Sequence, residues 1–226
     1  MTHLLDHPIW TALTTRQQGI ALGGEAARRY HPAIAPFADM RDTSPESFAA
    51  LHALLQPADQ VVLFTPDPIT PPPEFTVHMA KTGEQMTGTP STVTGAAPDI
   101  VTLGAADVPE MLALVELTKP GPFLLRTHEM GTFLGIRIGG RLAAMTGERM
   151  KPAHYTEMTA VCVHPDHRGR GYAQVLLAAV SRQIVARGEI PFLHVFSDNA
   201  AAIALYRRQG MEIRRRMCVT VVGRSA

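Results

Sequence analysis

The segment that most constrains the fold is an apolar run, a turn with two glycines and a long amphipathic stretch, which follow one another directly. The apolar run covers residues 157–163 and the turn covers residues 164–171. Apolar side chains then recur at helical spacing up to Arg187, at Ala173, Leu176, Leu177, Val180 and Ile184. A helix with one apolar side packs on a sheet. The sequence therefore predicts a strand, a tight turn and a helix that covers the sheet.

The chemistry of this turn favours an anion. The first N–H groups of a helix have no partner within the helix and point toward any ligand that lies before it. Gly169 and Gly171 permit the turn and a close approach of the backbone, and Arg168 and Arg170 add positive charge where a diphosphate would lie. The turn is not a P-loop, because no Gly-Lys-Ser/Thr follows, and it lacks the G-x-G-x-x-G of dinucleotide folds.

The elements around this segment are regular after residue 99 and weak before it. Predicted strands are 100–103, 132–138, 141–146, 157–163, 191–196 and 217–222, and predicted helices are 107–117 (with Asp107 as N-cap), 173–187 and 199–209. Gly139-Gly140 predicts a hairpin. Before residue 95 we expect a helix at 45–55, a strand at 61–64 and a strand at 75–80 that turns at 81–84. Residues 87–98 are rich in Gly, Thr, Pro and Ala, so we predict two domains, 1–95 and 96–226.

Two ordered motifs carry a family resemblance. The pattern Arg168-x-x-Gly171-x-Ala173, preceded by Val163-His164-Pro165, resembles the acyl-CoA signature of the GNAT superfamily of N-acyltransferases. The second signature of that family resembles Asp198-Asn199, Leu205-Tyr206 and Gln209-Gly210-Met211. Residues 157–162 are similar to the branch related to glycine N-acyltransferases.

The resemblance covers roughly residues 100–222 and implies an α/β (α+β) fold with a mixed, mostly antiparallel central sheet flanked by helices. The N-terminal region is then either a degenerate copy of the same fold or a lid that shapes the acceptor pocket, without a second cofactor site. Trp10, Tyr30, His31 and Phe37 are expected in an apolar core, with pocket lining as the alternative.

By resemblance, acetyl-CoA is the acyl donor, and an acyl chain longer than acetyl stays open. The implied binding residues are Cys162 and Val163 through their main chain, Arg168, Gly169, Arg170, Gly171, Tyr172 and Ala173 in the loop, and Asn199. Asn199 and Tyr206 lie seven residues apart and so share one face of a helix. Tyr206 would protonate the departing thiolate. Cys162 is expected to be a buried thiol rather than a nucleophile.

Attack on the thioester requires a neutral amine, so a base is needed. Glu157 is the candidate that the resemblance implies, because family members often carry a water-linked carboxylate on this strand. His194 on the next strand is the second candidate. The mechanism implied is direct attack, with no metal and no covalent acyl-enzyme.

The bulk composition limits the partners. A net charge of +1 supplies no broad field toward nucleic acid or an anionic membrane. No basic leader and no apolar run of about 18 residues occurs, so we expect a cytoplasmic protein. The two cysteines fall at no metal-ligand spacing. The expected acceptor is a primary amine of a small molecule or peptide, and a homodimer stays open.

Two other functions stay open at this point. One is a catalytically inactive acyl-CoA-binding regulatory module, against which the retained Tyr206 argues. The other is a nucleotide-binding interaction domain whose glycine turn holds ATP.

Overall fold

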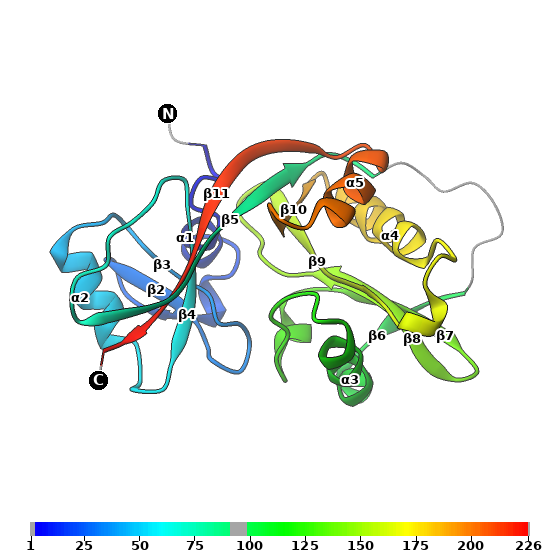
Figure 1. The fold of residues 1–226 in the computed structure, drawn as a ribbon, viewed down its shortest axis with the longest axis horizontal. Helices are drawn as coiled ribbons and strands as arrows, with labels where there is room; N and C mark the ends of the chain where they lie inside the picture. The colour runs from blue at the N-terminus through cyan, green and yellow to red at the C-terminus, as the bar shows by residue number, and fades with distance from the viewer. Residues whose placement is uncertain (1–2, 91–98, 226) are drawn as a thin grey trace.

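The computed structural model describes residues 3–90 and 99–225, and it has two parts joined by a pair of long strands. In Figure 1 the N-terminal part lies on the left and most of the C-terminal part on the right. The joining strands are β5 (Phe75–Thr87) and β11 (Glu212–Arg224), which pair antiparallel along almost their whole length. The two parts therefore share a continuous sheet.

This sheet has eight strands, and its order is β4-β11-β5-β10-β9-β8-β7-β6. The remaining bounds are β4 Gln60–Thr65, β6 Ile100–Leu103, β7 Phe133–Ile138, β8 Arg141–Glu148, β9 Tyr155–Val163 and β10 Ile190–Phe196. Every neighbouring pair is antiparallel except β9 with β10, which is parallel. The predicted mixed, mostly antiparallel sheet is confirmed. Its strands come from both sides of residue 95, and the division into two domains stays a prediction.

Helices cover both faces of the C-terminal half of the sheet (Figure 1). The helix α4 (Tyr172–Ala186) packs on β8 and β9 through a core that includes Met158, Leu176 and Val180. The helix α3 (Val108–Thr118) packs on the same strands through a second core that includes Cys162 and Met111. Met158 and Cys162 are four residues apart and would share a face of a regular strand, but one extra residue in β9 between Thr159 and Cys162 shifts the alternation and places them in different cores. The helix α5 (Ala200–Arg208) follows β10.

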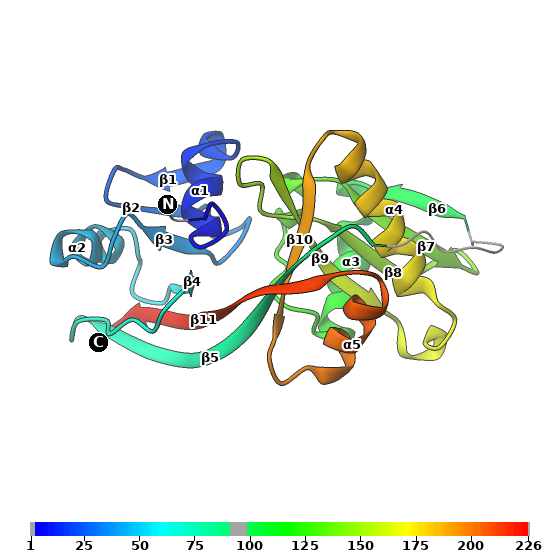
Figure 2. The ribbon, with the colours of Figure 1, turned by 90° about the horizontal axis from the view of Figure 1, so that it is seen from above.

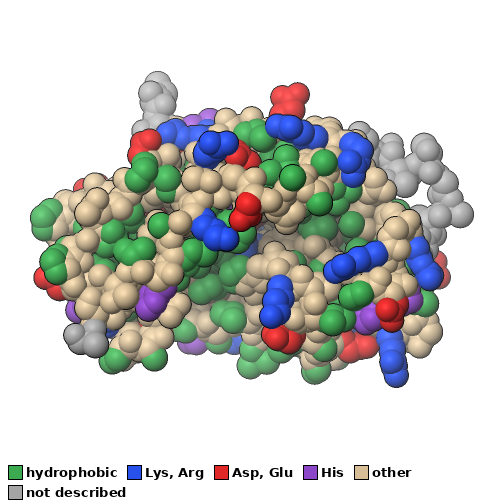
Figure 3. All heavy atoms as spheres, viewed as in Figure 1, with side chains coloured by type: hydrophobic (Ala, Val, Ile, Leu, Met, Phe, Trp, Pro, Cys, Tyr) green, Lys and Arg blue, Asp and Glu red, His purple; other side chains and the backbone are tan. Residues whose placement is uncertain are grey.

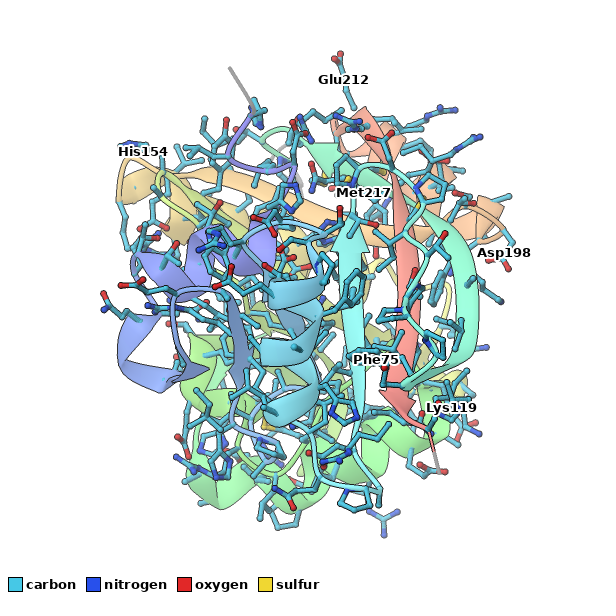
Figure 4. All side chains as sticks on the ribbon, turned by 90° about the vertical axis from the view of Figure 1, so that its left-hand side faces the viewer. Phe75, Lys119, His154, Asp198, Glu212 and Met217 are labelled. Atoms are coloured by element: carbon cyan, nitrogen blue, oxygen red, sulfur yellow. The ribbon has the colours of Figure 1, made fainter. Side chains whose placement is uncertain are left out.

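The N-terminal part carries its own three-stranded antiparallel sheet, with the order β1-β2-β3 (Figure 2). Its elements are α1 (Pro8–Thr14), β1 (Ala21–Gly23), β2 (Ala27–Tyr30), β3 (Ala38–Met40) and α2 (Pro45–Ala53). A single parallel bridge from Phe37 to Val62 connects this sheet to β4. In Figure 4, β4, β11 and β5 lie side by side, with Phe75 at the start of β5 and Met217 on β11. Short 3₁₀ helices are Gln18–Ile20, Ala105–Asp107, Thr127–Met130 and Pro165–His167.

Most predicted elements agree with these bounds, and one does not. Gly139 and Gly140 both have positive φ, 56° and 80°, as the hairpin requires. The turn expected at 81–84 is wrong, because β5 continues to Thr87. Gly83 lies in the middle of that strand, paired with Phe196 on one side and Met217 on the other. Pairing on both edges outweighs the local turn propensity. Part of the expected linker, residues 91–98, lies outside the described residues.

In the described ranges, no helix combines the length and apolarity that a membrane span needs.

The central position of β5 predicts the effect of truncating its core side chain. Met86 has 0% exposure and packs in the same core as α4, whereas Val77 on the same strand is 46% exposed. We expect Met86→Ala to lower the free energy of unfolding by about 2–5 kcal/mol. Val77→Ala, the matched control, should cost less than about 1 kcal/mol. Urea unfolding measures both, and equal losses would contradict a core role for β5.

Candidate active site

The site begins where β9 and β10 separate. The two strands pair only where Tyr155 to Glu157 face Ile190 to Phe192. Beyond that point β9 contains a bulge, in which Ala160 takes a φ of 51° and β8 is one residue short. A bulge bends the strand that carries it. The rest of β10 has no register with β9, while its other edge pairs with β5 along Phe192 to Phe196, so β9 and β10 diverge and leave a fork.

A cavity of about 880 Å³ occupies this fork and extends toward the N-terminal part. Its lining includes residues 158–163 of β9, residues 193–196 of β10 and residues 167–174 around the glycine turn. The N-terminal segments contribute Phe37, Val62, Phe64 and Met79. In Figure 3 the hollow at the middle of the face is lined largely by hydrophobic side chains. One cavity thus connects the predicted cofactor loop to the N-terminal part.

The glycine turn has the geometry of an anion-binding loop. Gly169 and Gly171 both have a φ of 76°, and Gly171 is the N-cap of α4. The N–H groups of residues 169–173 donate to no acceptor among the described residues. Arg168 and Arg170 are exposed and make no ion pair there either. Tyr172 and Ala173 open the helix and also line the cavity. This arrangement offers backbone donors and two guanidinium groups to a diphosphate.

The open edge of β9 is contributed by Val163 rather than Cys162. The N–H of His164 donates to the carbonyl of Ala143, and Met145 is paired with Cys162. Because main-chain groups alternate in direction along an antiparallel ladder, those of Cys162 face β8 and those of Val163 face the fork. Burial raises the pKa of the Cys162 thiol to about 11. The Cys162 thiol therefore keeps its proton at neutral pH, and Val163 has the free main-chain groups.

Asn199 and Tyr206 both line the cavity from α5. The side-chain oxygen of Asn199 accepts from the N–H of Ala202 and caps the helix, which leaves its amide N–H groups for a ligand. Tyr206 is 8% exposed, and its hydroxyl has no hydrogen-bond partner among the described residues. Burial raises the pKa of Tyr206 to about 12, so the hydroxyl keeps its proton at neutral pH. The pair can bind and donate to one ligand.

Glu157 lies at the fork but is fully engaged by other residues. Its side chain has 0% exposure, and it accepts from Nε and Nη2 of Arg149 at 2.8 Å each and from Nδ1 of His194 at 2.8 Å. Burial alone would raise the pKa of Glu157, but the charge and hydrogen bonds of Arg149, with the hydrogen bond of His194, lower it to about 2. Glu157 is not among the residues that line the cavity, whereas Arg149 and His194 are.

The second ring nitrogen of His194 is also engaged. Its Nε2 lies 3.0 Å from Nε2 of Gln85. The Gln85 amide is oriented by its other bonds, since Nε2 also donates to the carbonyl of Leu5 and Oε1 accepts from Arg214. Gln85 therefore donates to His194, which carries its own proton on Nδ1. Neither predicted base has a free lone pair in this arrangement.

Two residues of this network, Arg149 and Gln85, could not be predicted from the sequence. Arg149 follows β8, and Gln85 comes from a strand 109 residues before His194. Neither belongs to a motif. The only available signal was that a buried carboxylate requires a cationic partner, which does not say which arginine supplies it.

Aromatic side chains of the N-terminal part complete this network. The guanidinium of Arg149 lies 4.4 Å from the ring centre of Phe37. Phe37 stacks on Phe64 at 5.7 Å, and Phe64 stacks on His194 at 4.3 Å with an angle of 9° between the rings. Phe37 thus has both predicted uses, in the core and at the cavity wall. The aromatic contacts hold the N-terminal part against the fork.

Comparison with known proteins agrees with this geometry. Residues 133–220 match the family model described as FR47-like protein. The crystal structure of a protein of Novosphingobium aromaticivorans assigned to the acetyltransferases of the GNAT family superposes with a TM-score of 0.92, at 42% identity over 100% of both chains. The chain belongs to the GNAT family.

Relatives of this GNAT protein are named as acetyltransferases. An acetyltransferase of Yersinia pestis is 33% identical over 106 residues, which cover 46% of this chain and 67% of the relative. The N-alpha-acetyltransferase RimI of Mycobacterium tuberculosis is 38% identical over 93 residues, covering 37% and 56% of the two chains. The protein is an acetyltransferase, and GNAT acetyltransferases use acetyl-CoA. Within residues 3–90 and 99–225, no group of three or more His, Cys, Asp or Glu could hold a metal ion.

Removing the buried carboxylate should be costly. Glu157→Gln leaves Arg149 buried without its counter-charge, and we expect the free energy of unfolding to fall by about 3–5 kcal/mol at pH 7. Glu129→Gln, which breaks the exposed Arg126–Glu129 pair, should cost less than about 1 kcal/mol. Urea unfolding of both variants measures the difference, and a cost for Glu157→Gln as small as that of the control would contradict the network.

The same variant should have a different pH dependence. Because folding lowers the pKa of Glu157, its contribution is present above the unfolded pKa of about 4.3 and is lost as the pH falls through the folded pKa. Wild-type stability should therefore decline below about pH 5 more steeply than that of Glu157→Gln. Parallel curves would show that the carboxylate is not stabilised by folding.

The two arginines of the loop should determine coenzyme A affinity. We expect Arg168→Glu and Arg170→Glu each to raise the Kd for coenzyme A at least about tenfold, since a charge-assisted hydrogen bond contributes about 1.5–3 kcal/mol. Arg182→Glu changes the charge equally on the exposed side of α4 and should leave the Kd within about twofold. Calorimetry checks this, and wild-type affinity in both loop variants would exclude the loop as the phosphate site.

Proposed function

We propose that this enzyme transfers the acetyl group of acetyl-CoA to a primary amine of a small molecule or peptide, by direct attack within a ternary complex. One observation carries the proposal. A single cavity joins the anion-binding turn, the open main chain of Val163 and the Tyr206 hydroxyl to a recess in the N-terminal part. Donor and acceptor can therefore meet without a covalent acyl-enzyme.

The binding roles follow from position. The diphosphate lies on the N–H groups of residues 169–173 with Arg168 and Arg170 beside it. The pantetheine arm runs along the fork and bonds to the main chain of Val163 and the amide of Asn199. Cys162 supports this edge from the core and forms no covalent bond.

The chemical step is a substitution at the thioester carbon. The amine nitrogen attacks this carbon, the C–S bond breaks and the nitrogen loses one proton. The sulfur receives a proton from Tyr206, whose buried hydroxyl stays protonated until negative charge develops beside it. The proton from nitrogen restores Tyr206 through solvent, so the products are an acetamide and free coenzyme A.

Other expectations accompany this proposal without further support. The place within the glycine N-acyltransferase branch, the cytoplasmic location and a homodimer stay predictions. Glu157 as a general base also stays a prediction, although its bonds to Arg149 and His194 favour a role in positioning.

Replacing Tyr206 tests the chemical role. Tyr206→Phe keeps the ring in its core but removes the hydroxyl, and we expect kcat to fall about 10²-fold or more while the Kd for coenzyme A stays within about twofold. Tyr155→Phe, at a tyrosine outside the cavity lining, should leave both values nearly unchanged. Thiol release from acetyl-CoA gives kcat. Unchanged turnover in Tyr206→Phe would remove Tyr206 as the acid.

The same assay distinguishes an enzyme from an inactive binding module. Wild-type protein should release thiol from acetyl-CoA faster with an accepted amine than without any amine. Coenzyme A binding by calorimetry, together with no amine-dependent release across a broad amine panel, would support the regulatory module instead.

A further inference from the structure

The charges around the cavity bear on what the acceptor amine is, an inference that rests on the proposed transferase function. Among the described residues, no Asp or Glu lines the cavity. The charged side chains that do so are all basic, namely Lys119, Arg149, Arg168, Arg170 and Arg208. A polycationic acceptor would find no carboxylate here to pair with its second charge. The lining therefore favours an acceptor without a second positive charge.

The N-terminal end of the cavity is an apolar recess. Its walls are the hydrocarbon side chains of Phe37, Val62, Phe64 and Met79, together with Val219 and Val221 of β11. Phe37 and Phe64 are stacked and almost fully buried, so the recess is preformed. Burying an apolar group of the ligand against these side chains is favourable, whereas a polar group would find no hydrogen-bond partner among them.

One polar donor is fixed at the edge of this recess. Arg149 is 6% exposed and lines the cavity, and its Nε and Nη2 are used by Glu157. Its Nη1 has no acceptor among the described residues. The ion pair and the ring of Phe37 fix the plane of the guanidinium. A guanidinium held in this way is suited to bind an oxygen of the ligand.

No free base lines this end of the cavity in the part of the chain that the structure describes. Glu157 is saturated, and Nε2 of His194 accepts from Gln85. The other histidine in the lining, His167, belongs to the phosphate turn. An amine that is partly neutral on its own needs no strong base. An α-amino group at the start of a peptide has a pKa of about 7.7–8.0, against about 10.4 for a lysine side chain.

We propose that the acceptor is an α-amino acyl unit with an apolar side chain. Its α-amine faces the thioester, its carbonyl or carboxylate oxygen accepts from Nη1 of Arg149, and its side chain fills the recess beside Phe37 and Phe64. A free apolar amino acid and the N-terminal residue of a peptide share the α-amine, the oxygen and the apolar side chain. The carboxylate of the free amino acid makes its amine more basic, and the experiment separates the two.

The test is a kinetic comparison of amines with the full chain and saturating acetyl-CoA at pH 8, followed by thiol release. Phenylalanine represents the free amino acid, and phenylalaninamide represents the N-terminal residue of a peptide. Phenethylamine lacks the carbonyl or carboxylate oxygen, and glycinamide lacks the apolar side chain. Cadaverine and Nα-acetyllysine amide present alkyl amines. We expect kcat/KM for the better of the first two to exceed phenethylamine and glycinamide by at least about tenfold. The alkyl amines should be at least about 100-fold worse, from charge and amine pKa together.

Two variants test the acceptor assignment independently, so that one of them is sufficient if the other folds poorly. Arg149→Lys keeps a cation beside Glu157 but removes the Nη1 donor that is proposed to bind the acceptor oxygen. It should raise KM for the favoured α-amino substrate about tenfold and leave that for phenethylamine within about twofold, since only the former has the oxygen. Met79→Asp places a carboxylate in the recess and should shift the preference toward cadaverine.

Different outcomes test the acceptor assignment and the transferase function. A preference for cadaverine or Nα-acetyllysine amide in the wild type, or equal kcat/KM for phenethylamine and phenylalaninamide, would overturn the acceptor assignment and leave the transferase function intact. Coenzyme A binding without thiol release for any amine would overturn the transferase function itself.

Discussion

The buried carboxylate of Glu157 is the constraint on which the site depends. It lies at the last paired position of β9 with β10, opposite Phe192. An ionised carboxylate with no exposure to water is costly unless it is paired and hydrogen-bonded. Arg149 supplies two bonds from the segment after β8, and His194 supplies one from β10. The network therefore ties the chain together at the position where the sheet must open.

The opening results from β9 leaving one edge of β10 while β5 stays paired with the other edge. One edge of β10 pairs with β9 along Ile190 to Phe192, and the opposite edge pairs with β5 along Phe192 to Phe196. The bulge at Ala160 turns β9 away, while β5, held on its other edge by β11, keeps β10 in place. The N-terminal half of the chain thus takes part in building the fork. It also supplies the aromatic pair that packs on Arg149 and His194.

Local signals in the sequence were sufficient for most elements and for the glycine turn before α4. Gly169 and Gly171, the helix that follows them and the Gly139-Gly140 hairpin depend on backbone geometry that only a few residue types permit. Long-range pairing was not visible in the same way. Lys81-Thr82-Gly83-Glu84 has the composition of a turn, yet Glu84 is buried in the strand and bonds Ser197 and Arg216.

The details of the site show the same limit. Glu157 has the position of a base in the sequence, but its environment was set by Arg149, Gln85 and His194, whose proximity no motif announces. Cys162 and Val163 are adjacent, and the phase of the ladder decides which main chain faces the fork. That phase depends on three-dimensional pairing rather than on either residue type.

A crystal structure with coenzyme A bound measures the central claim directly, that the fork between β9 and β10 holds the donor. The account predicts the diphosphate on the N–H groups of residues 169–173, the pantetheine arm bonded to the main chain of Val163, and the sulfur beside the Tyr206 hydroxyl. Coenzyme A lying outside the fork, with Arg168 and Arg170 directed away from its phosphates, would contradict it.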